Sequence, residues 1–177
     1  MKEKTIQLYN FEELNAEAKI KALDDHNEHN DYDFLSENLS EYLVQLLEEN
    51  RIKGDAKLFY SLSNCQGDGV CFTGDFEFQG INFNVEHNNG HYYHNNSTNI
   101  TAEKDENDDG DELRADVIEV LTQDAEENFK EVYKEICDAI EKTGYAQIEH
   151  EQSEECFKEM CDANEYTFRA SGEMENF

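Results

Sequence analysis

The sequence predicts an α+β fold, in which a mainly antiparallel sheet of four to six strands carries about four helices on one face. The first observation is period-two alternation over residues 70–78, with one apolar parity formed by Val70, Phe72, Phe76 and Phe78. The second is the pair of glycine-containing turns, Gln66–Gly69 and Gln79–Gly80, that flank this segment and can reverse the chain. The third is a set of segments with apolar residues at helical spacing, which can cover the apolar face of the sheet.

The first 50 residues are expected to form two helices after a short opening strand or extended arm at Ile6 and Leu8. Asn15 can cap a helix that runs to about His29 and has Ala16, Ile20 and Leu23 on its apolar side. A second helix is predicted over residues 33–50, where the apolar spacing is followed by Leu35, Leu39, Tyr42, Leu43 and Leu46.

The central segment is predicted to be an antiparallel meander. A strand before the Gln66–Gly69 turn has Leu58, Tyr60 and Leu62 inward, and a strand after Gly80 has Ile81, Phe83 and Val85 inward. The dipeptide Asn89-Gly90 is typical of a two-residue hairpin. It predicts a fourth strand over residues 92–101.

The C-terminal part begins with an acidic loop at about residues 103–112. A third helix is expected over at least residues 123–142, on an apolar stripe of Val117, Leu121, Ala125, Phe129, Val132, Ile136 and Ile140. Gly144 is expected to end this helix, before a fifth strand over 145–149. A last helix over 153–163 and a short strand over 165–168 follow. Because no linker interrupts this order, residues 1–177 are expected to form a single domain.

The composition favours a cytoplasmic protein. The N-terminal residues lack the apolar stretch of a secretory signal, and no apolar run approaches the roughly 20 residues of a membrane span. The five cysteines are an odd number without a C-x-x-C pair, which is typical of reduced thiols. We therefore expect no contact with membranes.

The charge balance is the most unusual property of the chain. Forty-three acidic residues face 14 basic ones, for a net charge of −29. This charge repels nucleic acid and attracts basic surfaces, most of which bind nucleic acid; a role in solubility alone is the alternative. On the third helix the acids recur about every 6 Å along the axis, compared with a phosphate about every 3.4 Å along a DNA strand. The candidate partner-binding residues are Asp105, Asp108, Asp109, Asp111, Glu112, Asp124, Glu127, Glu131, Glu135 and Asp138.

Two segments carry residues of the types that bind metal ions. His87, His91 and His94 lie within eight residues and could share a zinc ion, although the expected hairpin separates them. Residues 105–116 have the spacing of a calcium loop, but Asp116 replaces its final glutamate and a strand precedes it. We expect neither stoichiometric zinc nor calcium binding tighter than millimolar. No cofactor and no catalytic motif is indicated.

Two segments resemble a family of small phage and prophage proteins of unknown function. They are residues 60–72, which include the Gln66-Gly67-Asp68-Gly69 block, and residues 8–19; segments 90–94 and 144–145 share the likeness. The resemblance implies a phage setting in a bacterial host and no particular activity. Small, very acidic phage proteins are similar in kind to anti-restriction and anti-CRISPR inhibitors, several of which mimic DNA.

These observations together predict a non-enzymatic phage inhibitor that binds the basic, nucleic-acid-binding surface of a host defence protein. One alternative is a metal-binding module or metal-dependent enzyme that uses the His87–His94 segment or the Asp105–Asp116 loop. Another is an antitoxin-like partner of a basic toxin. Direct binding of nucleic acid is not expected, and a homodimer is compatible with the sequence.

Overall fold

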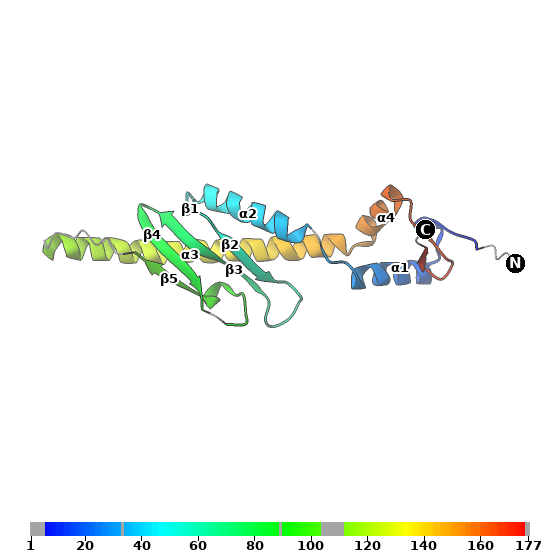
Figure 1. The fold of residues 1–177 in the computed structure, drawn as a ribbon, viewed down its shortest axis with the longest axis horizontal. Helices are drawn as coiled ribbons and strands as arrows, with labels where there is room; N and C mark the ends of the chain where they lie inside the picture. The colour runs from blue at the N-terminus through cyan, green and yellow to red at the C-terminus, as the bar shows by residue number, and fades with distance from the viewer. Residues whose placement is uncertain (1–5, 33, 89, 104–111, 176–177) are drawn as a thin grey trace. The chain divides into compact units, whose positions relative to one another are not determined.

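The computed structural model of the chain describes residues 6–32, 34–88, 90–103 and 112–175, and for residues 112–119 it describes the backbone alone. Within these residues, four α-helices accompany an antiparallel sheet of five strands and a small two-stranded sheet (Figure 1). This composition confirms the predicted α+β class.

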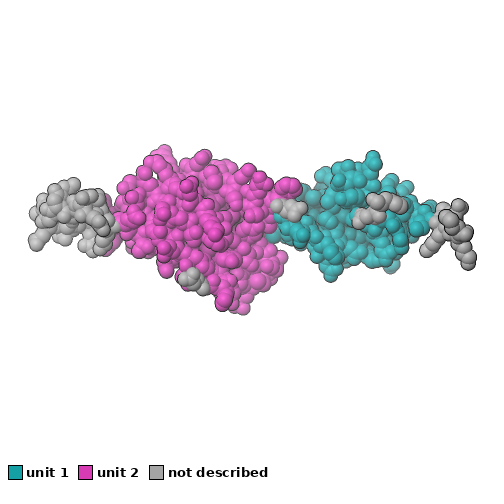
Figure 2. Space-filling model, in the orientation of Figure 1, with its two compact units in different colours: residues 1–33, 146–177 teal, residues 34–145 magenta. Residues whose placement is uncertain are grey.

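The internal contacts divide the chain into two compact units (Figure 2). Unit 1 combines residues 1–33 with residues 146–177, and unit 2 consists of residues 34–145. The expectation of a single domain stays a prediction. Each unit is described by itself below.

The larger sheet belongs to unit 2, and all of its strand pairs are antiparallel. Strands β3, Gly69–Phe78, and β4, Ile81–His87, form its centre, and β5, Thr98–Ala102, pairs with the far side of β4. Two short strands pair with the other side of β3. They are β1, Lys53–Gly54, and β2, Lys57–Ser61. The predicted meander is therefore present in the predicted order.

The apolar parity of β3 faces the core, as the alternation predicts. Val70, Phe72, Phe76 and Phe78 are buried. Helix α3, Glu112–Glu151, covers this face: its Phe129 ring stacks on Phe83 of β4 with centroids 4.5 Å apart. Its Tyr133 hydroxyl donates to the Phe72 carbonyl at 2.9 Å and accepts from the Phe72 N–H at 3.0 Å. The sheet and α3 therefore share one aromatic core.

Helix α2, Leu35–Glu49, is the second helix of unit 2 and matches its prediction closely. Its buried residues recur every four positions at Leu35, Leu39, Leu43 and Leu47. This spacing gives the helix one apolar face, which packs into the core.

Helix α3 differs from its prediction at the C-terminal end. The prediction of a stop at Gly144 and a strand over 145–149 is wrong, because the helix continues to Glu151. A Cβ atom at Gly144 would lie 2.4 Å from Leu62 Cδ1 and 3.3 Å from Leu39 Cδ1. Glycine at this position therefore allows helix α3 to pack closely against Leu62 and Leu39. At its other end, Leu121 is 59% exposed, so the predicted apolar stripe is not buried throughout.

The connection between β4 and β5 also differs from its prediction. Residues 88–97 join the strands, with a short 3-10 helix η2 at Asn95–Ser97, instead of a two-residue hairpin at Asn89-Gly90; Asn89 itself lies outside the described residues. The connection packs against the glycine turn. A Cβ atom at Gly67 would lie 2.8 Å from the Tyr92 ring, and one at Gly69 would lie 2.7 Å from His94 Nδ1.

Unit 1 is built from helix α1, Ala16–Glu28, helix α4, Glu154–Ala163, the 3-10 helix η1, Phe11–Glu13, and the hairpin of β6, Thr167–Phe168, with β7, Met174–Glu175. The N-terminal arm joins this hairpin through a single antiparallel bridge between Tyr9 and Phe168. The core of the unit contains the rings of Phe11, Phe157 and Phe168.

Helix α1 confirms the predicted cap and one residue of the predicted apolar side, Leu23, which packs against the core of unit 1. The Asn15 side chain accepts a hydrogen bond from the Ala18 N–H at 2.9 Å, as expected of an N-cap. The buried residues are Ala18 and Ala22, whereas Ile20 is 61% exposed. The small alanines face the core because they permit close packing.

Candidate partner-binding surface

The predicted acidic row on α3 lies on its exposed side. The side chains of Asp124, Glu127, Glu131, Glu135 and Asp138 are all exposed, and Glu127, Glu131 and Glu135 recur one turn apart. We call these five residues the α3 acidic row. The structure therefore brings together the helical half of the predicted site.

The loop half of the predicted site is not described. Asp105, Asp108, Asp109 and Asp111 lie outside the described residues, and Glu112 is the first residue of α3 without a described side chain. The described site is therefore the α3 acidic row alone.

Within the described part of the chain, the α3 acidic row has almost no local partners. Asp124, Glu127, Glu131 and Glu135 form no ion pair there, and Asp138 accepts one neutral hydrogen bond, from Asn95 Nδ2 at 3.1 Å. The nearby Lys130 pairs instead with Glu126 one turn earlier. The row therefore forms no ion pair among the described residues and its side chains face solvent, although Lys130 and Lys134 lie between its acids on the same helix.

Several acids of unit 1, in contrast, form ion pairs with neighbouring basic side chains. Glu12 pairs with Lys158 at 2.6 Å and with Lys19 at 3.1 Å, and the hydrogen bond from Lys158, followed by that from Lys19, lowers the pKa of the Glu12 carboxyl. Glu173 pairs with Lys21 at 3.4 Å and with Arg169 at 3.6 Å. Because every described lysine and arginine of unit 1 forms an ion pair within that unit, these acids differ from those of the α3 acidic row.

The burial of one acid, Asp68 of the glycine turn, was not predicted from the sequence. Asp68 is only 7% exposed, and its carboxylate accepts hydrogen bonds from residues 61–65, which precede the turn, and from α3. The donors are the Ser61 hydroxyl at 3.1 Å, the Ser63 N–H at 2.7 Å, the Cys65 N–H at 3.0 Å, the Cys65 thiol at 3.1 Å and the Tyr145 hydroxyl at 2.5 Å. Asp68 thus organises the turn and connects it to α3.

The hydrogen bonds of this network shift the pKa values of Asp68 and Tyr145. Burial alone would raise the pKa of Asp68, but the hydrogen bonds from Tyr145, Cys65 and Ser63 outweigh burial and hold that pKa well below its usual range. Burial, with the hydrogen bond to Asp68, raises the pKa of Tyr145 to about 12. Asp68 is therefore an ionised structural acceptor in the Gln66–Gly69 turn.

The candidate zinc residues do not converge. His87 Nε2 lies 3.1 Å from the Tyr92 carbonyl oxygen, and its ring lies near Phe59 and Tyr93 at centroid distances of 6.1 and 5.7 Å. His94 packs on Gly69, and His91 is exposed. Among the described residues, no three His, Cys, Asp or Glu side chains form a group that could hold a metal ion. Most of the candidate calcium loop, residues 105–116, lies outside the described residues, so the calcium expectation stays a prediction.

The cysteines are free thiols, as expected. Burial raises the pKa of Cys71 and of Cys161 to about 11, and burial also raises that of Cys137. Because the thiolate is the reactive form, these three thiols are poor nucleophiles at neutral pH.

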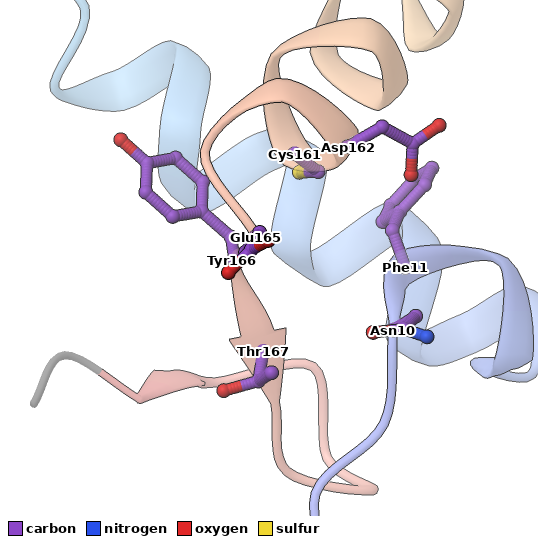
Figure 3. Close-up of a pocket in the computed structure, with 7 residues that line it drawn as sticks. All are labelled: Asn10, Phe11, Cys161, Asp162, Glu165, Tyr166 and Thr167. Atoms are coloured by element: carbon purple, nitrogen blue, oxygen red, sulfur yellow. The ribbon is translucent and has the colours of Figure 1, made fainter.

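Unit 1 contains a pocket of about 450 Å³ where the N-terminal arm passes the end of α4 (Figure 3). The side chains of Asp162 and Tyr166 point away from each other in this view. Neither lysine, arginine nor histidine occurs in the described lining of Asn10, Phe11, Cys161, Asp162, Glu165, Tyr166 and Thr167. With the Cys161 thiol protonated, these residues do not pair a nucleophile with a base.

No protein-family model, no curated protein and no solved structure matches this chain. Among the described residues, every helix is too short or too polar to cross a membrane.

Proposed function

We propose that this chain is a non-enzymatic, phage-encoded inhibitor that binds a basic, nucleic-acid-binding surface of a host defence protein. The observation that carries the proposal is the α3 acidic row, whose carboxylates are exposed and form no ion pair within the described residues. The phage setting rests on the sequence resemblance. The proposed place of action is the cytoplasm of an infected or lysogenic bacterium.

Electrostatics supports this kind of partner. A molecule with a net charge of −29 attracts a basic surface before contact, which increases the association rate. A single exposed ion pair contributes up to about 1 kcal/mol, so useful affinity requires several carboxylates to act together. Glu127, Glu131 and Glu135 repeat about every 6 Å along a helix. This rigid row can substitute for some of the phosphates of a nucleic-acid strand, which is the form of DNA mimicry that we propose.

The test compares two charge-reversed proteins with the same net charge. The first carries Glu127→Lys, Glu131→Lys and Glu135→Lys on α3. The matched control carries Glu37→Lys, Glu41→Lys and Glu48→Lys on α2, which are also exposed glutamates on a helix of unit 2. The immobilised wild-type chain first captures its partner from a bacterial lysate, and both variants are then titrated against the purified partner.

We expect the α3 variant to lose most of its affinity and the α2 variant to retain most of it. Equal losses would show that net charge alone acts, and unchanged binding by the α3 variant would contradict the proposed surface. The captured protein itself is assayed for nucleic-acid binding. A toxin without such activity would favour the antitoxin-like alternative.

A further inference from the structure

Strand β5 lies at one edge of the sheet of unit 2, and its only strand partner among the described residues is β4 (Figure 1). Two backbone hydrogen bonds fix the pattern of this pairing. The Asn88 N–H donates to the Ser97 carbonyl at 2.9 Å, and the Glu103 N–H donates to the Asn82 carbonyl at 2.8 Å. Both pairs are thus of the hydrogen-bonded type and lie at the two ends of the β4–β5 ladder.

The directions of the remaining backbone groups follow from the register. Hydrogen-bonded and non-hydrogen-bonded pairs alternate along antiparallel strands. Asn99 and Thr101 therefore bond toward β4, whereas the N–H and C=O groups of Thr98, Ile100 and Ala102 point away from the sheet. The far side of β5 offers three donors and three acceptors at the spacing of a further strand.

The edge lacks the usual protection against strand addition. Edge strands are commonly protected by lysine, proline or a bulge. β5 contains no charged residue and no proline, and its register with β4 is unbroken. Residues 87–102 contain no acid at all, although the chain contains 43. An uncharged strand edge thus lies within a strongly acidic unit.

We infer that β5 is the docking edge for an extended basic segment of the partner, which adds to the sheet as a further strand. This inference rests on the proposed function and specifies how the partner is held. Charge selects the occupant: a second copy of the chain would bring two net charges of −29 together, whereas a basic segment is attracted. Main-chain hydrogen bonds give such complexes affinity, and alternate side chains give them specificity.

The two faces of the sheet predict the sequence of that segment. On one face, Asn99 is exposed and pairs across the ladder with the exposed Glu86, so basic side chains are favoured there. On the other face, Ile100 is half-buried and pairs with the buried Val85, so β-branched apolar side chains are favoured. We therefore expect basic and apolar residues to alternate in the bound segment.

The probe is an acetylated peptide of alternating lysine and valine, tested by titration at low salt. In antiparallel addition, the valines lie opposite Ile100 and direct their N–H groups to β5, while the lysine N–H groups face solvent. N-methylation of the valine amides should weaken binding roughly tenfold or more, since each lost hydrogen bond leaves a β5 acceptor unpaired. N-methylation of the lysine amides should leave binding near that of the parent peptide.

Hydrogen exchange measured by NMR gives a second readout. The amides of Thr98, Ile100 and Ala102 should exchange rapidly in the free chain and become protected when the peptide binds. Ile100→Pro removes one outward N–H donor without breaking the β4–β5 ladder. In this variant the peptide should no longer protect the amides of Thr98 and Ala102, whereas the Thr101 amide, which bonds to β4, should remain protected.

Each other outcome overturns the inference. Equal binding of both methylated peptides, without new protection, would mean charge attraction without strand addition, and the proposed function would stand. Protection of these amides in the free chain that increases with protein concentration would identify a second copy as the occupant. Absence of peptide binding at low salt would contradict docking at β5. The proposed function would then still be tested separately by the charge-reversed variants.

Discussion

Asp68 illustrates how a single buried carboxylate can organise a turn. Its oxygens accept hydrogen bonds from two backbone N–H groups, a thiol and two hydroxyls, and the most distant donor in sequence is Tyr145, 77 residues away. Because the ionised form accepts these bonds, the network favours a charged Asp68 in the folded chain. The pH dependence of stability should therefore report on this residue.

The first prediction concerns Asp68→Asn. The folded-state pKa of Asp68 is lowered, so its contribution is fully present above the unfolded-state pKa of about 3.9 and is lost as the pH falls toward the folded-state value. Urea denaturation should show a large stability difference between wild type and Asp68→Asn at pH 7, which narrows below about pH 4. The exposed Asp55 provides the control, since Asp55→Asn should show little difference at either pH. A stability difference between wild type and Asp68→Asn that does not change with pH would contradict the assignment of Asp68 as an ionised acceptor.

The same network predicts the effect of Tyr145→Phe. This change removes only the hydroxyl that donates to Asp68. Hydrogen bonds to charged groups contribute about 1.5–3 kcal/mol, so we expect a loss of that size in the free energy of unfolding at pH 7. In an Asp68→Asn background the loss should be much smaller, and additive effects would exclude a direct interaction.

Phe72 tests the orientation of the sheet. Its side chain is fully buried between Phe76 and Tyr133, with ring centroids 5.5 and 4.3 Å away. Phe72→Ala should cost roughly 3–5 kcal/mol in chemical denaturation, as truncation of a buried phenylalanine does. Val44→Ala on the exposed side of α2 should change stability by about 0.5 kcal/mol or less. A loss below about 1 kcal/mol for Phe72→Ala would contradict the buried face.

At the scale of elements, local periodicity predicted β3, β4 and α2, because their buried faces recur within a few residues. Gly144 was misinterpreted for the opposite reason. Its close neighbours, Leu62 and Leu39, come from distant segments, so the sequence alone could not distinguish a helix stop from a packing requirement. The prediction of a two-residue hairpin at Asn89-Gly90 was wrong for a similar reason. The connection packs against Gly67 and Gly69, which belong to another segment of the chain.

Gly144→Ala measures this packing requirement. A Cβ atom would lie 2.4 Å from Leu62 Cδ1, and such overpacking typically costs about 1–3 kcal/mol. The gain in helix propensity offsets about 1 kcal/mol. We therefore expect a net loss of up to about 2 kcal/mol in wild type, and a gain of about 1 kcal/mol in a Leu62→Ala background. Equal stabilisation in both backgrounds would show that Leu62 does not restrict this site.

At the scale of the whole molecule, charge is the dominant property. The sequence could predict the α3 acidic row, because helical periodicity determines which acids share an exposed face. It could not predict that the row forms no ion pair among the described residues while unit 1 pairs several of its acids, since ion pairs depend on tertiary positions. Asp68 was missed because Tyr145, which anchors it, is remote in sequence.

The salt dependence of partner binding follows from this surface. Exposed charges are screened as the Debye length falls from about 10 Å at 0.1 M salt to about 3 Å at 1 M. Affinity for the basic partner, measured by titration, should therefore fall steeply over this range. The α3 triple variant should show a weaker salt dependence than the α2 control, because it retains fewer of the carboxylates that face the partner. Salt-independent binding would indicate an apolar interface.

We propose above that carboxylates of this chain occupy a surface at which the partner binds nucleic acid. The most direct measurement is a competition assay in which labelled DNA is bound to the purified partner and the chain is added at several salt concentrations. We expect the chain to displace DNA and each ligand to weaken the binding of the other, most strongly at low salt. If the partner binds the chain and DNA together without mutual loss of affinity, the surfaces are different and mimicry of nucleic acid is contradicted.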